Sequence, residues 1–337
     1  MRAYEIQGSF GLSNLKRVDA PDPEPGPGEV LVRVRACSLN FRDLMMVRGE
    51  YNPRQPLPLV PLSDGVGEVA AVGAGVTRVR TGDRVAGIFA QRWLAGPFTP
   101  EARASTLGGP LPGMLRSHAV LGEDGLVKVH DYLSTEEAAT LPCAALTAWH
   151  ALAEEGAVRP GEWVLLLGSG GVSVFGLQLA KLFSARVVVV TGSPDKVARL
   201  RELGADAVID RRAEPDWERK VQKLTGGGAD VVLEVGGADT LARSLQAVRL
   251  SGRIMVIGVL SGVEARLPVT SILMKNVRLQ GVFVGSREMF ENLNRALAAS
   301  RLRPVIDRVF DFEQAPEAFE ALAAGRHFGK LVIRIAD

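Results

Sequence analysis

The sequence predicts an α/β protein with two domains: a β-rich domain that includes the N-terminus and a doubly wound parallel sheet. Three observations predict this fold class. The chain has 337 residues, a length typical of two domains. Twelve of its 19 prolines fall within residues 1–112, where they separate short segments of alternating apolar and polar residues, a pattern typical of antiparallel strands. From Trp163 onward, apolar strand segments alternate with helical segments, which favours a parallel sheet with crossover helices.

Composition and charge exclude several classes of protein. Apolar residues make up 47% of the chain, which is enough for packed cores and argues against disorder. The 40 Lys and Arg residues nearly balance the 38 Asp and Glu residues, so we expect no nucleic-acid partner and no acidic membrane partner. The two cysteines are too few for a disulfide framework.

No segment predicts export or a membrane span. The first residues carry charge without an apolar run behind it, so we expect no signal peptide. Residues 163–180 contain no charged side chain, but they include four glycines and the polar residues Ser169, Ser173 and Gln178. A buried strand, a turn and a buried helix explain this composition better than a membrane span does. We expect a cytoplasmic protein.

The β-rich domain begins with alternating segments. Residues 29–35 and 67–72 alternate apolar and polar side chains, and residues 82–87 form a turn followed by a strand. These segments indicate a barrel or a sandwich. The pattern changes at Ser134, because Ser134 with Glu137 three residues later is typical of a capped helix start.

The second domain contains six strand candidates, the number found in a doubly wound dinucleotide-binding sheet. They are residues 163–167, 186–190, 207–210, 230–234, 253–258 and 278–284. Helical segments such as 193–203 and 240–250 separate most of them. The remaining residues alternate helix, strand, helix and strand over 286–300, 304–310, 313–324 and 330–335, and we expect them to return to the β-rich domain. The predicted domains are residues 1–140 with 286–337, and residues 141–285.

A glycine-rich loop is the strongest motif in the chain. It lies between the apolar strand 164–167 and a predicted helix over 174–183, and its residues are Gly168, Ser169, Gly170, Gly171, Val172 and Ser173. Gly168 permits a tight turn, Gly170 lets the backbone approach a pyrophosphate, and the helix N-terminus supplies free N–H groups. Ser173 stands where the dinucleotide fingerprint has its third glycine. The strand before the loop and the helix after it still predict a dinucleotide site.

The end of the second strand favours NADP(H) as the cofactor. An NAD site usually has an acidic residue there that binds the ribose hydroxyl groups, whereas this chain has Thr191. Ser193 and Lys196 follow and can donate to a 2′-phosphate, and Arg211 and Arg212 follow the third strand. The alternative role for Lys196 is that of a solvated helix residue.

Other loops at the carboxyl ends of strands are expected to line the cofactor site. The candidate residues in these loops are Gly192, Gly236, Gly258, Val259 and Val284. The alternative for the glycines is an ordinary turn position without a ligand.

These motifs resemble those of the medium-chain dehydrogenase/reductase superfamily and, within it, the zinc-independent quinone oxidoreductase branch. The resemblance covers nearly the whole chain and rests on the glycine loop and on residues 40–44, 65–69, 82–85, 141–148 and 203–206. It implies a Rossmann domain with a doubly wound parallel sheet and a GroES-like β-barrel catalytic domain. It also implies that Thr147 touches the nicotinamide, with a helix-face threonine as the alternative, and that residues 279–284 pair with those of a second copy in a homodimer.

The resemblance also bears on a catalytic metal. Zinc-dependent members bring a Cys, a His with a neighbouring Glu, and a later Cys to one zinc ion. This chain has Asn40, then Ser63 with Asp64, and then Cys143 at those positions. Because a catalytic zinc site needs about three good ligands, no metal is expected. Both cysteines are expected to be buried structural thiols.

Two residues are expected to activate the substrate without a metal. In the resembling branch an Asn and a Tyr eleven residues later face the nicotinamide pocket, and Asn40 and Tyr51 have that spacing. Such donors can stabilise the enolate oxygen that forms when hydride reaches a conjugated carbonyl. The alternatives are a helix cap for Asn40 and a loop aromatic for Tyr51. Asp43 either orients a donor or forms an ion pair with Arg42 or Arg84.

A long loop completes the expected site. Residues 91–118 are interrupted by Gly and Pro and contain aromatic residues, and long loops in compact domains are often functional. Trp93 and Phe98 are expected to border a small-molecule substrate pocket with Asp64 as a polar wall, and core packing is the alternative. The expected activity is NADPH-dependent reduction of a quinone or an enone. The alternatives are an alcohol dehydrogenase or carbonyl reductase, and a non-catalytic nucleotide-binding protein.

Overall fold

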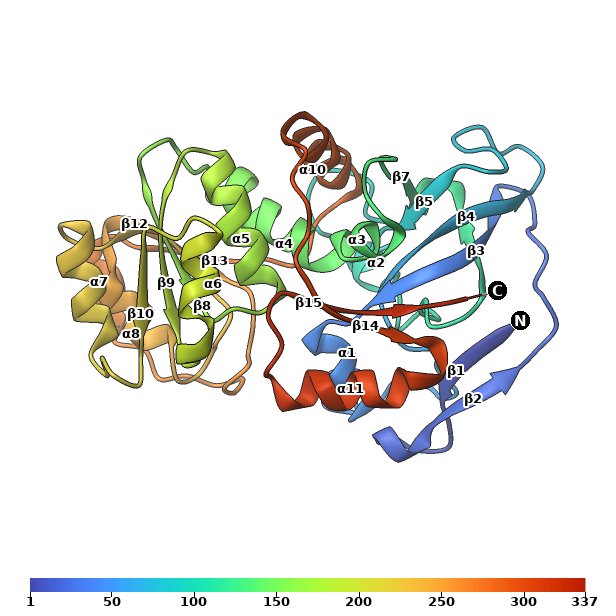
Figure 1. The fold of residues 1–337 in the computed structure, drawn as a ribbon, viewed down its shortest axis with the longest axis horizontal. Coiled ribbons are helices and arrows are strands. Elements are labelled where there is room, and N and C mark those ends of the chain that lie inside the picture. The colour runs from blue at the N-terminus through green and yellow to red at the C-terminus, as the bar shows by residue number, and fades with distance from the viewer. Residues whose placement is uncertain (337) are drawn as a thin grey trace. The chain divides into compact units, whose positions relative to one another are not determined.

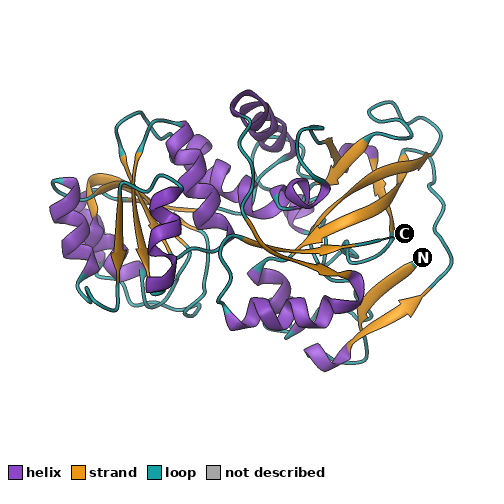
Figure 2. Cartoon of the chain, viewed as in Figure 1, coloured by secondary structure: helices purple, strands orange, loops and turns teal. Residues whose placement is uncertain are grey.

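The computed structural model describes residues 1–336 and divides into two compact units. The β-rich unit consists of residues 1–146 together with the segment that starts at Val284, and the parallel-sheet unit consists of residues 147–283. Figure 1 follows the chain through both units, and Figure 2 shows that each contains helices and strands. The predicted α/β class is confirmed. The chain divides after residue 146 and before residue 284, where the sequence predicted boundaries at 140 and 286.

The β-rich unit is built on a seven-stranded sheet and a separate two-stranded one. The large sheet has the order β14-β15-β3-β4-β5-β7, and β6 also pairs with β3. Along β3, Val30, Val32 and Val34 are buried, which explains why an alternating segment becomes a strand with one face in the core. The strands are β1 (Arg2–Ile6), β2 (Leu15–Asp19), β3 (Glu29–Ser38), β4 (Asp64–Val72), β5 (Arg84–Gly87), β6 (His118–Gly122), β7 (Leu126–Lys128), β14 (Ile306–Asp311) and β15 (Lys330–Arg334).

Helices of the β-rich unit pack on the same core as its strands. Leu44 of α1, Phe319 of α11 and Ile333 of β15 belong to one apolar cluster, and Figure 1 shows α1 and α11 side by side. The helices are α1 (Phe41–Val47), α2 (Pro100–Arg103), α3 (Thr135–Ala139), α10 (Arg287–Ser300) and α11 (Ala315–Ala324). Single 3₁₀ turns lie at Leu12–Asn14, Glu123–Gly125 and Phe312–Gln314.

The parallel-sheet unit contains all six predicted strands, in the order β10-β9-β8-β11-β12-β13. Every neighbouring pair is parallel, which is the arrangement of a doubly wound sheet. The strands are β8 (Trp163–Leu167), β9 (Arg186–Thr191), β10 (Ala207–Asp210), β11 (Ala229–Glu234), β12 (Val248–Val256) and β13 (Arg278–Gly281).

Crossover helices connect the parallel strands. They are α5 (Gly171–Leu182), α6 (Val197–Glu202), α7 (Trp217–Thr225), α8 (Leu241–Ala247) and α9 (Val269–Lys275), with a 3₁₀ turn at Pro194–Lys196 before α6. The chain enters this unit through a helical run that comprises Leu141–Ala145, α4 (Leu146–Trp149) and His150–Glu154. None of the helices between residues 1 and 336 has the length and apolar character needed to cross a membrane.

Several predicted element boundaries are wrong, including both ends of the strand predicted over 253–258, the end of the strand predicted over 278–284, and two helix boundaries. The helix predicted over 240–250 ends at Ala247, and the next residues already belong to β12. The ammonium group of Lys275 donates to the carbonyl oxygens of Leu245, Gln246 and Val248 at 2.9, 2.8 and 2.8 Å. A lysine of α9 thus provides hydrogen-bond donors to the carbonyl groups at the end of α8. The helix predicted from residue 174 begins earlier, at Gly171.

Candidate functional site

A buried polar cluster lies where β3 ends and α1 begins. Asn40 stands directly before α1, and the carboxylate of Asp43 accepts a hydrogen bond from the Asn40 backbone N–H at 2.9 Å. Asp43 is fully buried and lies 3.3 Å from the guanidinium of Arg42. Burial raises the pKa of Asp43 to about 6, while the positive charge of Arg42 opposes this shift. Of the two ion-pair partners considered for Asp43, the structure provides Arg42.

Asp64 is the acceptor at the centre of this cluster. It is the first residue of β4 and lies opposite Ser38 in the register between β3 and β4. Its carboxylate accepts hydrogen bonds from Ser38 Oγ at 2.8 Å, Asn40 Nδ2 at 2.9 Å and Ser63 Oγ at 3.3 Å. Both Ser63 and Asp64 are fully buried. The structure therefore brings three residues from separate predicted roles, Asn40, Asp43 and Asp64, into one cluster.

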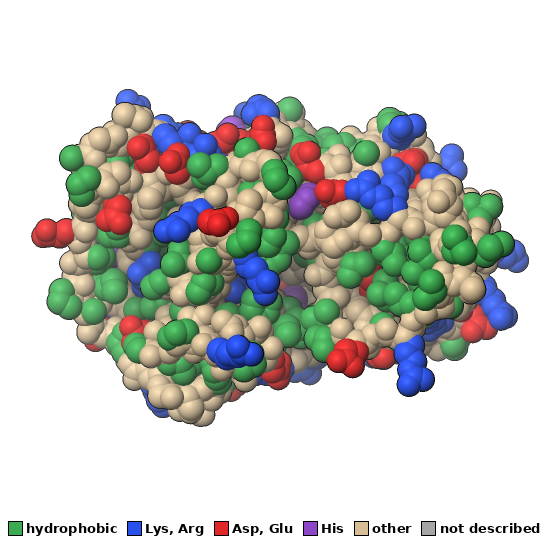
Figure 3. Space-filling model, turned by 180° about the vertical axis from the view of Figure 1, so that it is seen from behind, with side chains coloured by type: hydrophobic (Ala, Val, Ile, Leu, Met, Phe, Trp, Pro, Cys, Tyr) green, Lys and Arg blue, Asp and Glu red, His purple; other side chains and the backbone are tan. Residues whose placement is uncertain are grey.

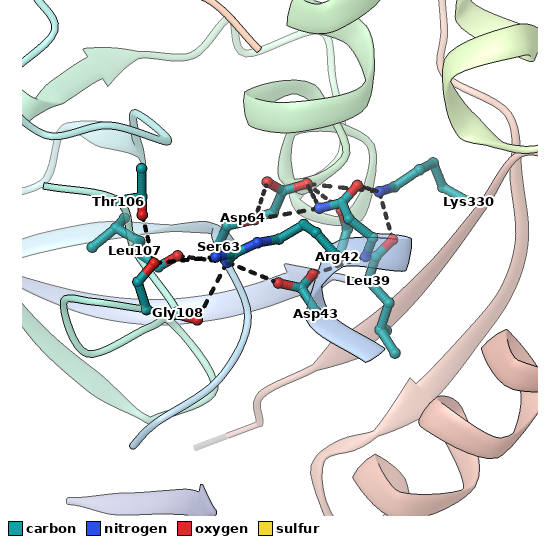
Figure 4. Close-up of polar contacts among 12 residues, drawn as sticks. Leu39, Arg42, Asp43, Ser63, Asp64, Thr106, Leu107, Gly108 and Lys330 are labelled. Carbon is teal, nitrogen blue, oxygen red and sulfur yellow. Dashed lines mark hydrogen bonds and ion pairs between the residues drawn. The ribbon is translucent and has the colours of Figure 1, made fainter. Parts of the chain in front are cut away.

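Lys330 is a cluster residue that the sequence did not indicate. Its ammonium group donates to Leu39 O at 2.7 Å and to Asn40 Oδ1 at 2.6 Å, and it lies 3.7 Å from Asp64 Oδ2. Figure 4 shows Lys330 reaching toward Leu39 and Asp64. The only signal in the sequence is a single charge at the head of the apolar strand predicted over 330–335.

Tyr51 stands beside this cluster rather than within it. Its ring lies over the Arg42 guanidinium at 4.8 Å, and the ring of Phe89 lies 5.1 Å from the same group. Arg42 also donates to the carbonyl oxygens of Leu107 and Gly108 at 2.8 and 3.3 Å, which fixes its position. The side chain of Tyr51 is 40% exposed, and its hydroxyl has no hydrogen bond to another residue within 1–336. This hydroxyl is therefore a donor that a ligand can reach.

The aromatic pair expected at the substrate pocket is packed together. The rings of Trp93 and Phe98 lie 4.8 Å apart, and the indole N–H of Trp93 donates to Gly96 O at 2.9 Å. Trp93 is buried, and its carbonyl accepts from the N–H of Arg287 at 2.9 Å. Core packing therefore accounts for Trp93, whereas Phe98 is partly exposed.

Neither cysteine has the setting of a reactive thiol. Burial raises the pKa of the Cys143 thiol far above its usual range, and the nearby charge of Asp64 raises it further. Burial also raises the pKa of Cys37, whose thiol donates to Met114 O at 2.9 Å. Both cysteines are buried and free.

The glycine loop of the parallel-sheet unit has the backbone geometry of an anion site. Gly168 follows β8 with φ +76°, a conformation that favours glycine. A Cβ on Gly168 or Gly170 would point into open space, so the backbone of this loop is accessible. Gly170 precedes α5, a helix of 12 residues whose first N–H groups have no partner in the preceding turn. The loop therefore offers a cradle of N–H groups to a pyrophosphate.

The missing third glycine of the fingerprint has a local explanation. Ser173 donates from Oγ to Leu167 O at 2.6 Å, so its hydroxyl satisfies the carbonyl at the end of β8. Close packing of helix on strand is instead provided by Gly176, where a Cβ would lie 3.0 Å from Leu166 and from Leu233. The role of the third fingerprint glycine, close packing of the helix on the strand, is thus provided three residues later, by Gly176.

The end of β9 is arranged around Gly192. A Cβ on Gly192 would lie 2.7 Å from Arg211 Nε, so the guanidinium of Arg211 packs directly on this glycine. Thr191 Oγ1 accepts from the backbone N–H of Ser193 at 3.1 Å, which turns the chain after the strand. Lys196 follows in the next turn and is buried.

The remaining candidate loops are shaped mainly by their own packing. Glu234, fully buried at the end of β11, accepts from the N–H groups of Gly236 and Gly237 at 2.8 and 3.0 Å and from Thr240 Oγ1 at 2.6 Å. Sequence reasoning treated Glu234 as an ordinary strand end and missed this role. A Cβ on Gly258 would lie 2.5 Å from Val235 O, which by itself requires glycine there.

The three other candidate cofactor residues have different surroundings. Val259 is partly exposed, and Thr147 is buried within α4. Val284 is buried with φ +41°, a strained backbone for a β-branched residue. Next to it, a Cβ on Gly285 would lie 2.8 Å from Leu146.

Comparisons with known proteins assign the family. Residues 26–131 match the family described as alcohol dehydrogenase GroES-like domain, and residues 171–299 match the one described as zinc-binding dehydrogenase. The zinc-type alcohol dehydrogenase-like protein C1773.06c of Schizosaccharomyces pombe is 40% identical over 333 residues, and the match covers 96% of each chain. The chain belongs to the medium-chain dehydrogenase/reductase superfamily.

Solved structures of superfamily members share the whole fold. An NAD-dependent alcohol dehydrogenase is 36% identical with a TM-score of 0.91 and full coverage of both chains, 100% of each. The 2-octenoyl-CoA carboxylase reductase CinF, in complex with NADP and 2-octenoyl-CoA, is 25% identical with a TM-score of 0.88 over 99% of this chain and 87% of that one. This chain is therefore an oxidoreductase of the superfamily, and its relatives include proteins that use nicotinamide cofactors.

Proposed function

We propose that this member of the superfamily uses NADPH to reduce a quinone or an α,β-unsaturated carbonyl compound without a catalytic zinc ion. The observation that carries the proposal is the buried cluster at Asn40, Ser63 and Asp64. Its atoms hydrogen-bond to one another and to the ammonium of Lys330, so the cluster offers hydrogen bonds where zinc-dependent relatives have metal ligands.

A zinc ion does not fit the residues at this position. Among them only Cys143 and Asp64 are of a type that binds zinc; burial raises the pKa of Cys143, and Asp64 already accepts from Ser38 and Asn40. An amide at Asn40 and a hydroxyl at Ser63 are poor ligands, and the ammonium of Lys330 lies 3.7 Å from the carboxylate of Asp64. Across residues 1–336, no three His, Cys, Asp or Glu side chains are grouped in a way that could hold a metal ion.

NADP(H), by contrast, fits the parallel-sheet unit. The backbone at Gly168 and Gly170 leaves the space in which a pyrophosphate would rest against the start of α5. At the end of β9 the chain has Thr191 instead of an acidic residue, and Arg211 stands over Gly192. A guanidinium at this place suits a 2′-phosphate, while a carboxylate would repel it.

The chain's own residues would act on the substrate oxygen. Bound NADPH supplies the hydride, and hydride addition to a conjugated carbonyl leaves negative charge on an enolate oxygen. Asn40 Nδ2 and the Tyr51 hydroxyl are the proposed donors to that oxygen, because preorganised donors stabilise charge as it develops. The hydrogen bond from Asn40 Nδ2 to Ser63 Oγ, at 3.4 Å, is the longest hydrogen bond in the cluster and is the one that a substrate oxygen would replace.

Alcohol or aldehyde chemistry is the second candidate. The family description and the fission yeast relative both name alcohol dehydrogenases or zinc, which favours this candidate. The donor set of the cluster argues against it, because alcohol oxidation without a Lewis acid lacks the charge that stabilises the alkoxide.

The test is NADPH oxidation by the purified protein with one quinone, one enone and one aldehyde. We expect turnover of the quinone or the enone, unchanged after treatment with a zinc chelator, with no stoichiometric zinc by elemental analysis. Turnover of the aldehyde alone, or loss of activity with the chelator, would overturn the proposal. Equal activity with NADH and NADPH would overturn the preference for NADPH and leave the proposed substrate class unaffected.

We also propose that the protein is a homodimer. Strand β13 forms one edge of the parallel sheet, and α9, which precedes it in the chain and packs on the neighbouring strand β12, exposes apolar side chains: Val269 and Leu273 are each 74% exposed and Met274 is 77% exposed. Figure 3 shows hydrophobic side chains at the molecular surface with charged ones around them. An open strand edge beside an apolar patch is typical of a self-association surface. The mass in solution tests this proposal.

A further inference from the structure

Lys330 is buried in a setting that is costly for an ammonium group. Only 3% of its side chain is exposed, yet both of its hydrogen-bond acceptors are neutral: Leu39 O and Asn40 Oδ1. The nearest carboxylate oxygen, on Asp64, lies beyond hydrogen-bond distance at 3.7 Å. Because burial of a charge disfavours folding unless partners compensate, Lys330 depends on these two acceptors and on the ion pair with Asp64, and it fixes their positions in return.

The fold places this ammonium group with local precision. Gly329 has φ +80°, and a Cβ on it would lie 2.4 Å from Val305 O, so glycine is required directly before Lys330. Strand β15 then runs beside β3, with Val332 opposite Ser38 in the register. The side chain of Lys330 consequently reaches Asn40, a residue 290 positions away in the sequence.

The ammonium group fixes which way the Asn40 amide faces. Its three hydrogens can only donate, so the atom of Asn40 that lies 2.6 Å away must be the oxygen. The Nδ2 group then faces the acceptors Asp64 Oδ2 at 2.9 Å and Ser63 Oγ at 3.4 Å. With the amide reversed, two donors would face each other at Lys330 and two acceptors at Asp64, which is unfavourable on both sides.

We propose that Lys330 is a positioning residue: it holds the Asn40 amide with its N–H groups toward the reacting oxygen and balances the buried charge of Asp64. This inference rests on the proposed function, in which Asn40 donates to the substrate. Without the ammonium group the amide is oriented only by its contacts with Asp64 and Ser63, so the reversed orientation, with an oxygen where a donor is needed, becomes easier to populate.

The first test compares Lys330→Met with Lys330→Arg. Loss of one preorganised donor to a developing oxyanion typically lowers kcat about 100-fold, so we expect that loss for Lys330→Met, with the KM for NADPH unchanged. Lys330→Arg retains a cation and should recover most of the activity. The matched control is Lys128→Met, since Lys128 is 55% exposed and pairs with Asp83 on the surface at 2.7 Å. A KM that rises while kcat is unchanged would overturn the inference.

A double-mutant cycle tests whether Lys330 acts through Asn40. If it does, Lys330→Met lowers kcat little further in the Asn40→Ala background, because the group that it positions is already absent. If the fold-loss in kcat of the double variant equals the product of the two single fold-losses, Lys330 acts independently of Asn40, and the inference is overturned. Circular dichroism and the thermal midpoint of each variant show whether it is folded. If Lys330→Met fails to fold, the kcat values of Lys330→Arg and Asn40→Ala are compared with that of the unaltered protein instead.

A spectroscopic readout separates this inference from the proposed function. Selective ¹⁵N labelling of asparagine reports on six residues, and Asn40→Ala assigns the side-chain pair of Asn40. We expect that pair to shift in Lys330→Met and to keep its position in Lys330→Arg. A wild-type protein that reduces no quinone or enone would end the proposed function while the shift still reports on positioning. An unchanged pair in Lys330→Met would end the inference even in an active enzyme.

Discussion

At the scale of single residues, the two buried carboxylates of the cluster have different partners. Asp64 accepts from Ser38 and Asn40 and has the ammonium of Lys330 nearby. Asp43 accepts from a backbone N–H and lies beside Arg42. Burial outweighs these partners at Asp43, whose pKa is raised to about 6. The ionised form of Asp43 is therefore less stable in the folded protein than in the unfolded chain.

The raised pKa of Asp43 predicts a pH dependence of stability. The folded protein holds a proton on Asp43 up to about pH 6, whereas the unfolded chain releases it near its ordinary value of 3.8. The contribution of Asp43 to the free energy of unfolding therefore falls by about 3 kcal/mol as pH rises from about 4 to about 6, and this contribution is level above that. In Asp43→Asn this contribution is absent, and urea denaturation from pH 4 to 7.5 measures the difference between the two proteins. A difference that is constant with pH would contradict the prediction.

A second residue-scale prediction concerns the choice of cofactor. Arg211 packs on Gly192 at the end of β9, so we expect its guanidinium to contact the 2′-phosphate. Arg211→Ala should weaken NADPH binding by about 10- to 100-fold, the usual value of a charged hydrogen bond, and leave NADH binding nearly unchanged. Fluorescence titration with both cofactors measures this. Arg219→Ala is the control, because Arg219 lies on α7 and is 78% exposed, and equal losses for NADPH and NADH would argue against the assignment.

At the scale of elements, the sequence predicted what is encoded locally. Alternation along residues 29–35 and the apolar segment before Gly168 predict strands because the buried positions recur within one strand. The end of α8 was misplaced because Lys275, a residue of another helix, satisfies its last carbonyl groups. Lys330 was missed for the same reason, since its contact with Asn40 joins segments 290 residues apart. Contacts between residues so far apart in the sequence leave no pattern of apolar and polar residues from which they could be predicted.

The start of α3 provides a prediction for one element. Ser134 Oγ accepts from the N–H of Glu137 at 3.1 Å, and Glu137 Oε2 accepts from the N–H of Ser134 at 2.8 Å, which forms the predicted capping box. Ser134→Ala should lower the free energy of unfolding by about 1 kcal/mol, and Ser134→Asp should restore most of it. Urea denaturation measures both. Ser300→Ala, at an exposed helix end, should change stability by less than about 0.5 kcal/mol, and an equal loss there would show that the cap is not the cause.

At the scale of the whole molecule, the two units make separate contributions to one proposed reaction. The parallel-sheet unit supplies an accessible glycine loop and a guanidinium, which are proposed to bind phosphate groups of the cofactor. The β-rich unit supplies the oriented amide of Asn40 and the exposed hydroxyl of Tyr51. Neither set performs a reduction alone, so cofactor binding and substrate activation can be altered independently by substitution. Changes at Arg211 should act on cofactor affinity, and changes at Asn40 or Lys330 should act on kcat.

The assembly of two copies gives the last prediction. Leu273 and Met274 of α9, which packs on β12 beside the edge strand β13, are 74% and 77% exposed, and in a two-fold interface each would be buried twice. Replacing both by lysine should raise the dimer dissociation constant by at least about 100-fold, since each large apolar side chain contributes about 1.5–3 kcal/mol on burial. Sedimentation equilibrium should show a dimer for the unaltered chain and a monomer for Leu273→Lys with Met274→Lys. Leu182→Lys is the control, because Leu182 is 38% exposed at the end of α5, which packs against β8 and β9, away from β13. A monomeric unaltered chain would rule out the dimer, and a double variant that stays dimeric would move the interface away from α9.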